Sequence, residues 1–134
     1  MAEHQIPTED EEQEALFDWA ESSKAKHPDL QWMHAIPNGG KRPIKTARTM
    51  KKTGTKKGVP DIFLPAPRGK YHGMYIEMKR TSRGQLSSEQ RDWLRALSDR
   101  GYYCVMCKGW VQAAKEIVIY LTQRNDSNGQ TKEE

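Results

Sequence analysis

The chain has 134 residues, of which 35% are apolar, so it can bury one hydrophobic core and is too short for two domains of ordinary size. No apolar run approaches the length that spans a bilayer, and the acidic N-terminus lacks the apolar segment of a signal peptide. These features predict a cytoplasmic protein without membrane association. The net charge is +4, but residues 1–30 carry nine acids and two bases, whereas residues 41–60 carry eight bases and no acid.

The N-terminal part predicts one helix. Residues 1–7 are expected to be flexible, and Thr8 with Glu11 matches the capping box that opens a helix. Acids crowd its first turn, where the helix dipole favours them. Apolar side chains then recur at helical spacing, and the helix is expected to end before Pro28.

A short strand is predicted at residues 31–36, followed by a tight loop at 37–40. His34 lies among apolar neighbours in this strand, so a packed side chain is favoured over a metal ligand or a base. Residues 43–52 predict a helix with a narrow apolar stripe, which is expected to dock on the body of the protein.

The bases of this helix and its flanking loops suit the phosphates of a nucleic acid, which release counterions when they are neutralised. A solvated helix face is the alternative. The candidate nucleic-acid-binding residues are Lys41, Arg42, Lys45, Arg48, Lys51, Lys52, Lys56 and Lys57.

The central stretch, residues 58–80, predicts two strands that return on each other through a loop rich in Pro and Gly. The first strand carries Asp61. In the second, Glu77 and Lys79 share a face, because successive side chains leave opposite faces of a strand. A hairpin-like return would bring Asp61 beside Glu77. Taken singly, each piece is also typical of a turn or a solvated strand face.

The C-terminal part predicts a helix, a strand and a second helix. Ser87 and Gln90 form another capping box, so Gln90 either caps its helix only or reaches the central site as a polar group. Cys104 and Cys107 lie in a strand on opposite faces and are interpreted as ordinary reduced thiols. Residues 8–122 are expected to form a single domain, and residues 123–134 a disordered tail.

Two carboxylates on neighbouring strands suit Mg²⁺ or Mn²⁺, which prefer oxygen ligands and keep water molecules for substrate exchange. A metal in such a site polarises a phosphoryl group and activates a bound water. An ammonium two residues from a ligand can orient that water and stabilise developing charge. Asp61, Glu77 and Lys79 therefore predict phosphodiester hydrolysis, with no organic cofactor.

At this point the residues resemble a known family. Pro60-Asp61 followed by Glu77-Met78-Lys79 is similar to the PD-(D/E)xK nuclease signature, and the chain resembles its virus-type replication-repair nuclease (VRR-NUC) branch. The likeness covers most of the chain in an ordered series of motifs. They are the acidic first helix with Gln13, Ile36-Pro37-Asn38-Gly39-Gly40, Lys57-Gly58-Val59-Pro60-Asp61, Ile76-Glu77-Met78-Lys79, Ser88-Glu89-Gln90 and Gly101-Tyr102.

The resemblance implies an α/β fold with a restriction-endonuclease-like core, in which a small mixed β-sheet is flanked by helices. It implies metal bound by Asp61, Glu77 and the backbone carbonyl of Met78, with Lys79 at the attacking water. It also implies a glutamine from the later helix, matched by Gln90.

The resemblance implies one further acid, supplied by the first helix as a catalytic residue and metal ligand. Glu9 fits the family's spacing of four residues before Gln13 and lies on the favoured helix face. Glu12 is the alternative.

Stand-alone members of this branch, encoded by phages or related elements, resemble homodimers that cut branched DNA such as four-way (Holliday) junctions. A relative in the Fanconi-anaemia-associated nuclease acts on flap-like substrates as a monomeric domain. The small size of this chain favours the first kind, which acts in DNA repair and, if phage-encoded, in the host cytosol. The alternatives are a flap-type nuclease, a restriction-type nuclease and a non-catalytic nucleic-acid-binding module.

Overall fold

The structure is a computed structural model that describes residues 5–37 and 44–123, without the side chains of residues 44–47. Lys41, Arg42 and the outermost parts of both termini therefore lie outside the described residues. The elements in chain order are α1 (Glu9–Ser23), a 3-10 helix η1 (Pro28–Trp32), β1 (His34–Ala35), α2 (Ile44–Lys52), β2 (Ile62–Leu64), β3 (Met74–Lys79), α3 (Ser88–Ser98), β4 (Tyr103–Lys108) and α4 (Trp110–Leu121).

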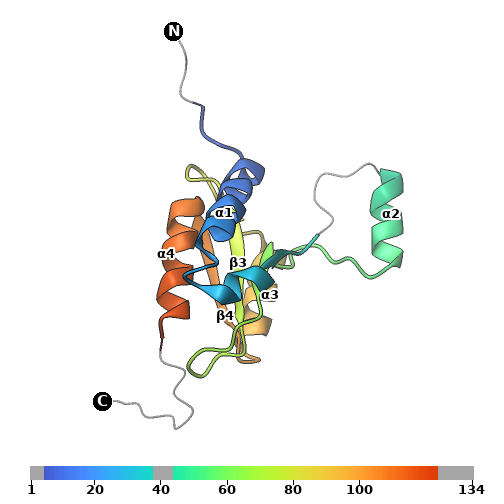
Figure 1. The fold of residues 1–134 in the computed structure, drawn as a ribbon. Helices are drawn as coiled ribbons and strands as arrows, with labels where there is room; N and C mark the ends of the chain where they lie inside the picture. Colours follow the sequence, from blue (N-terminus) through green and yellow to red (C-terminus); the bar gives the residue numbers. More distant parts are fainter. Residues whose placement is uncertain (1–4, 38–43, 124–134) are drawn as a thin grey trace.

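The four strands form one mixed sheet in the order β1-β2-β3-β4. The pairs β1/β2 and β2/β3 are antiparallel, as the predicted hairpin-like return requires, whereas β3 and β4 are parallel. Helices α1 and α4 pack on each other and on β3, and α3 packs on β4 (Figure 1). The predicted α/β class, with a small mixed sheet flanked by helices, is confirmed.

The hydrophobic core lies between the sheet and the pair α1/α4. Leu16 of α1, Ile117 of α4, and Ile76 and Met78 of β3 have no exposed surface. The alternate residues of β3 face the other side of the sheet, as the period of a strand predicts. That second face carries Glu77 and Lys79, which are also buried although they are charged.

The first predicted strand is the main correction to the expected secondary structure. Residues 31–36 contain only the two-residue β1, because the chain from Pro28 to Trp32 turns into η1. Pro28 suits the first turn of such a helix, since it has no N–H to leave unpaired. His34 is exposed rather than packed, and its Nδ1 lies 2.9 Å from the carbonyl oxygen of Trp32.

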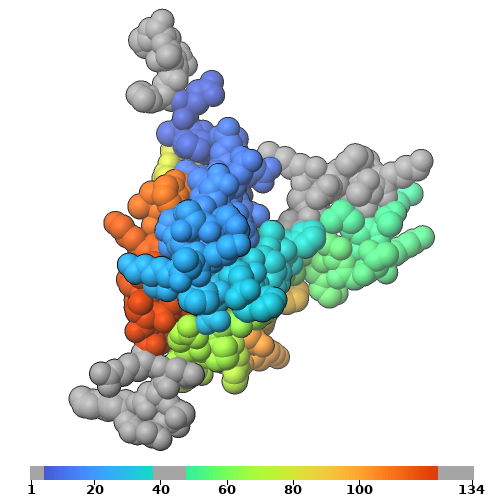
Figure 2. Space-filling view, in the orientation of Figure 1, coloured from blue at the N-terminus to red at the C-terminus, as the bar shows by residue number. Residues whose placement is uncertain are grey.

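Helix α2 forms at residues 44–52, close to the predicted range, but it does not dock on the sheet. It lies apart from the sheet and from the other helices (Figure 1). The residues after its first turn project from the body of the molecule (Figure 2). The side chains of Arg48, Lys51 and Lys52 are exposed on this projection.

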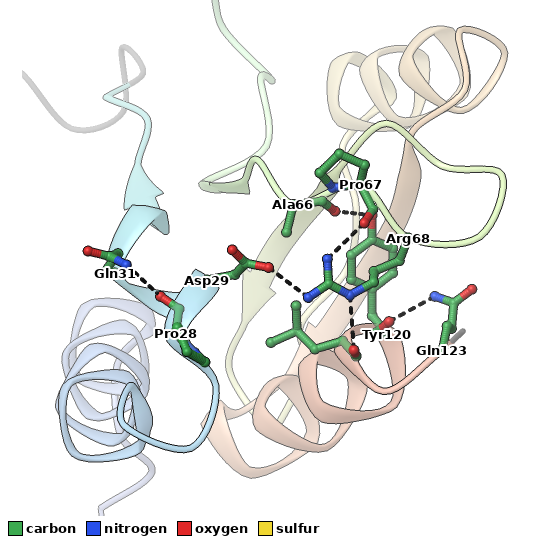
Figure 3. Close-up of polar contacts among 9 residues, drawn as sticks. Pro28, Asp29, Gln31, Ala66, Pro67, Arg68, Tyr120 and Gln123 are labelled. Carbon is green, nitrogen blue, oxygen red and sulfur yellow. Dashed lines mark hydrogen bonds and ion pairs between the residues drawn. The ribbon is translucent and has the colours of Figure 1, made fainter. Parts of the chain in front are cut away.

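Arg68 ties together three segments at the end of the sheet opposite Lys79 (Figure 3). Its guanidinium donates to Asp29 Oδ2 at 2.6 Å, to the Leu121 carbonyl at 3.0 Å and to the Pro67 carbonyl at 2.8 Å. The Tyr120 hydroxyl donates to the Ala66 carbonyl at 2.6 Å in the same region. These bonds fix η1 and the end of α4 to the loop between β2 and β3.

Candidate active site

Asp61 immediately precedes β2, and its position follows from strand register. Because Ile62 pairs with Ile76 in an antiparallel ladder, one further step of the register sets Asp61 opposite Glu77. The Met78 N–H donates to Asp61 Oδ2 at 2.8 Å. The side chain of Asp61 thus takes a β3 donor that would otherwise bond to the backbone of a longer β2.

Glu77 is 1% exposed and is held from α3 by Gln90. Gln90 Nε2 donates to Glu77 Oε2 at 2.9 Å. Its Oε1 accepts from the Ser87 N–H at 2.9 Å, while the Gln90 N–H donates to Ser87 Oγ, so the predicted capping box is also formed. The sequence left these two roles as alternatives, and one amide performs both.

Lys79 is a buried base that lies close to two acids. Its Nζ lies 3.7 Å from Glu77 Oε2 and 3.9 Å from Glu9 Oε2. The chain after β3 packs closely over it, since a Cβ added at Gly84 would lie 2.6 Å from Lys79 Cβ. Any side chain at position 84 would therefore displace Lys79 or the loop.

The two acids considered for the first helix have different surroundings. Glu9 faces Lys79 and keeps 47% of its side chain exposed. Glu12 is 5% exposed, and its Oε1 accepts from the Trp110 N–H at 2.8 Å, at the N-terminus of α4. Glu12 thereby caps α4 and joins it to α1, whereas Glu9 is the first-helix acid that lies at the charge cluster.

Burial raises the pKa values of both paired acids. The pKa of Glu77 is raised to about 9, first by burial and then by the charge of Asp61, although Lys79 opposes the rise. Burial also raises the pKa of Asp61, and the hydrogen bond from Met78 offsets part of that rise. Two acids with raised pKa values in one place are a frequent mark of a functional site.

The pair suits a hard divalent cation. Glu77 Oε1 is buried and has no hydrogen-bond partner among the described residues, an arrangement that costs free energy unless something binds there. A cation would supply that partner and relieve the repulsion between Asp61 and Glu77. Within residues 5–37 and 44–123 no cluster of three or more His, Cys, Asp or Glu side chains could hold a metal. Mg²⁺ needs only one or two carboxylates beside waters and phosphate oxygens.

Two basic residues lie a few positions before Asp61 in the sequence. Lys56 and Lys57 are exposed, and Lys57 Nζ lies 4.0 Å from Glu89 Oε2 on α3. Gly58 allows this close approach, because a Cβ there would lie 2.7 Å from Glu89 Cβ. The side chain of Lys45 belongs to those that are not described.

Arg80 was not singled out from the sequence, yet it fixes the entry to α1. Its Nε donates to the Pro7 carbonyl at 3.3 Å and its η2 nitrogen to the Ile6 carbonyl at 3.1 Å. The contact joins the residue after Lys79 to the segment that leads into Glu9. No local pattern reveals such a bond, because its partners are 73 and 74 positions apart.

Comparison with known proteins agrees with the resemblance. The family model described as the VRR-NUC domain matches residues 5–110. The chain belongs to the VRR-NUC family. A solved structure of a "VRR_NUC domain protein" superposes with a TM-score of 0.78 at 28% identity, covering 91% of this chain and 94% of that one. A search of curated proteins finds no match.

As a VRR-NUC domain, the chain is a nuclease domain that acts on DNA, from a family that is generally metal-dependent. The described helices include none with the length and apolar character needed to cross a membrane.

Cys104 and Cys107 are free, and burial raises their pKa values to about 11 and about 12, so both are protonated near neutral pH.

Proposed function

We propose that this VRR-NUC domain is a Mg²⁺- or Mn²⁺-dependent, structure-selective endonuclease that hydrolyses phosphodiester bonds in branched DNA, with four-way junctions as its preferred substrate. The observation that carries the proposal is the pair Asp61 and Glu77 beside Lys79. Both carboxylates have raised pKa values, and one Glu77 oxygen is buried without a partner among the described residues. A buried pair of this kind costs stability, which a binding function explains.

Asp61, Glu77 and the Met78 carbonyl would hold the metal. When bound, it supplies a Lewis acid for the phosphoryl group and lowers the pKa of a water. Gln90 orients Glu77 through the bond from Nε2, as outer partners of metal ligands commonly do.

Lys79 and Glu9 supply the remaining chemistry of the proposed site. Lys79 keeps its ammonium 3.7 Å from Glu77 Oε2, where it orients the attacking water and stabilises charge that develops on the phosphate. Glu9 pairs with Lys79 at 3.9 Å and is the first-helix acid of the site. The catalytic set of the proposal is therefore Asp61, Glu77, Lys79, Glu9 and Gln90.

The exposed bases of α2 and the following loop are proposed to bind the DNA backbone. Arg48, Lys51, Lys52, Lys56 and Lys57 are exposed, and the loop that carries the last two leads directly to Asp61. Phosphate contacts of this kind supply affinity and position the substrate without reading its sequence. Lys41, Arg42 and Lys45 extend the same basic segment.

A second copy of the chain is part of the proposal, because two active sites are needed to cut opposing strands of a junction. Light scattering on the free protein measures this, with a dimer expected and a monomer at micromolar concentration contradicting it.

The test is cleavage of labelled linear, flap and four-way DNA with Mg²⁺ or Mn²⁺. We expect preferential cutting of the four-way substrate and a loss of about 10³-fold or more in Asp61→Asn, since a lost metal ligand removes several kcal/mol of transition-state stabilisation. Asp18→Asn, an exposed acid on α1, serves as the matched control.

The other outcomes of this cleavage assay lead to different conclusions. Cutting confined to flaps, or at one sequence on linear duplex, replaces the junction proposal with a flap-type or restriction-type nuclease. Equal cleavage by wild type and Asp61→Asn removes Asp61 from the mechanism. Metal-independent binding without any cleavage indicates a binding module.

A further inference from the structure

A row of aromatic side chains crosses the sheet on the face that carries the carboxylates. The aromatic row consists of His34, Phe63, Tyr75 and Tyr102, from β1, β2, β3 and the residue before β4. Neighbouring rings lie within contact range: centroids are 5.8 Å apart for His34 and Phe63, 4.4 Å for Phe63 and Tyr75, and 5.2 Å for Tyr75 and Tyr102. The rings thus form one continuous surface.

Strand period sets the aromatic row beside the candidate active site. Phe63 is two residues from Asp61 and Tyr75 is two residues from Glu77, so each pair shares a face of the sheet. Two residues of a strand span about 7 Å. That is the length of about two stacked nucleotides at about 3.4 Å each along one DNA strand.

The aromatic row remains accessible, unlike the opposite face of the sheet. His34 is exposed, and Phe63, Tyr75 and Tyr102 are each partly exposed. Helix α3 packs on β4 at one side of this face and does not close over β1 and β2. None of the four side chains carries a carboxylate, so nothing in the row itself repels a polyanion.

From these positions we infer that the aromatic row stacks unpaired bases of the DNA whose backbone enters the Asp61–Glu77 site. The inference rests on the proposed function and deepens it, because it names unpaired nucleotides as the part of a branched substrate held next to the scissile phosphate. Aromatic rings stack on any base, which suits selection by structure rather than by sequence. Bases within a duplex stack on each other and leave no face for a protein ring.

The test is binding of a single-stranded oligonucleotide that contains 2-aminopurine, in EDTA so that no cleavage occurs. Stacking on an aromatic ring quenches the fluorescence of 2-aminopurine. We expect Phe63→Leu to lower quenching and to weaken single-strand affinity about fivefold or more, with affinity for fully paired duplex unchanged. Leucine keeps an apolar cover over Gly73, where the Phe63 ring packs.

Two further variants make the test decisive. His34→Ala alters an exposed residue at the edge of the sheet, so it tests the row even if Phe63→Leu unfolds. Tyr71→Leu is the matched control, because Tyr71 is a partly buried ring that packs on the core at the opposite face. Equal quenching and affinity in wild type, His34→Ala and Phe63→Leu would overturn the inference. So would a dimer that becomes a monomer in Phe63→Leu with single-strand affinity unchanged, because the row would then join two copies.

Failure of the inference is distinguishable from failure of the proposed function. If wild type cuts branched DNA but the row variants bind single strands normally, the nuclease proposal stands and the inference falls. If the row variants lose single-strand affinity while wild type cuts nothing, the inference stands and the nuclease proposal falls.

Discussion

Replacing Glu12 with alanine should destabilise the domain without altering the charges around Lys79. Glu12 is 5% exposed, and its Oε1 accepts the Trp110 N–H at 2.8 Å. A hydrogen bond to a charged group contributes about 1.5–3 kcal/mol, and an acid at a helix N-terminus adds about 0.3–1 kcal/mol. We therefore expect the free energy of unfolding to fall by about 2–4 kcal/mol, which lowers Tm by about 8–16 °C in a domain of this size.

Glu9→Ala is the matched comparison. Its carboxylate is 47% exposed in the pair with Lys79, and exposed ion pairs contribute only about 0–1 kcal/mol. Thermal unfolding and DNA cleavage below Tm are measured for both variants. Glu12→Ala should lose stability and keep its cleavage activity. Glu9→Ala should keep its stability and lose cleavage activity. A Glu12→Ala protein that melts within about 2 °C of wild type would refute the capping role.

Three further predictions concern Gln90, Gly109 and the two cysteines. Gln90→Ala should slow cleavage by about 10- to 100-fold because Glu77 loses its orienting partner, whereas Gln112→Ala, an exposed amide on α4, should not. Gly109→Ala should lower the free energy of unfolding, measured in urea, by more than Gly54→Ala. Both have positive φ, 87° and 98°, at a cost of about 1–2 kcal/mol, but only a Cβ at Gly109 meets another side chain, Thr81 Cγ2 at 2.7 Å. The rate of alkylation of Cys104 and Cys107 should be low at pH 8 and still rise beyond pH 10, because burial raises their pKa values to about 11 and about 12. The rate is measured by mass spectrometry, and a rate that levels off near pH 9 in the folded protein would contradict this prediction.

Local patterns predicted the elements that depend on local physics. Both capping boxes formed as the sequence indicated, with Thr8 bonded to Glu11 and Ser87 to Gln90. The alternation in β3 also set Glu77 and Lys79 on one face, opposite the core. These features depend on residues a few positions apart, so one sequence contains the information that determines them.

Two predictions were wrong, the strand at residues 31–36 and the docking of α2, and the reason in both cases is not local. The segment at 31–36 carries strand-forming residues, but its first part became η1, because tertiary context overrides weak local preference. Helix α2 has an apolar stripe that predicted docking, yet it stands apart from the sheet. Which surface an amphipathic helix contacts depends on distant parts of the chain, or on a partner.

At the site itself, the acids of the first helix show what the sequence alone could not determine. The family resemblance left Glu9 and Glu12 as alternatives. Contacts with distant parts of the chain separate them, since Glu12 bonds to Trp110, 98 residues away, and Glu9 lies beside Lys79. One signal was available: Glu12, Leu16 and Ala20 recur every four residues and are the buried residues of α1.

Calorimetric titration of Mn²⁺ into the purified protein measures whether Asp61 and Glu77 bind a divalent metal. Wild type and the control Asp18→Asn should bind with equal affinity, and Asp61→Asn and Glu77→Gln should each weaken binding at least tenfold. The amide substitutions keep the shape of each side chain, so a folded variant loses only the charged ligand. Unchanged Mn²⁺ affinity in both variants would show that Asp61 and Glu77 do not bind the metal.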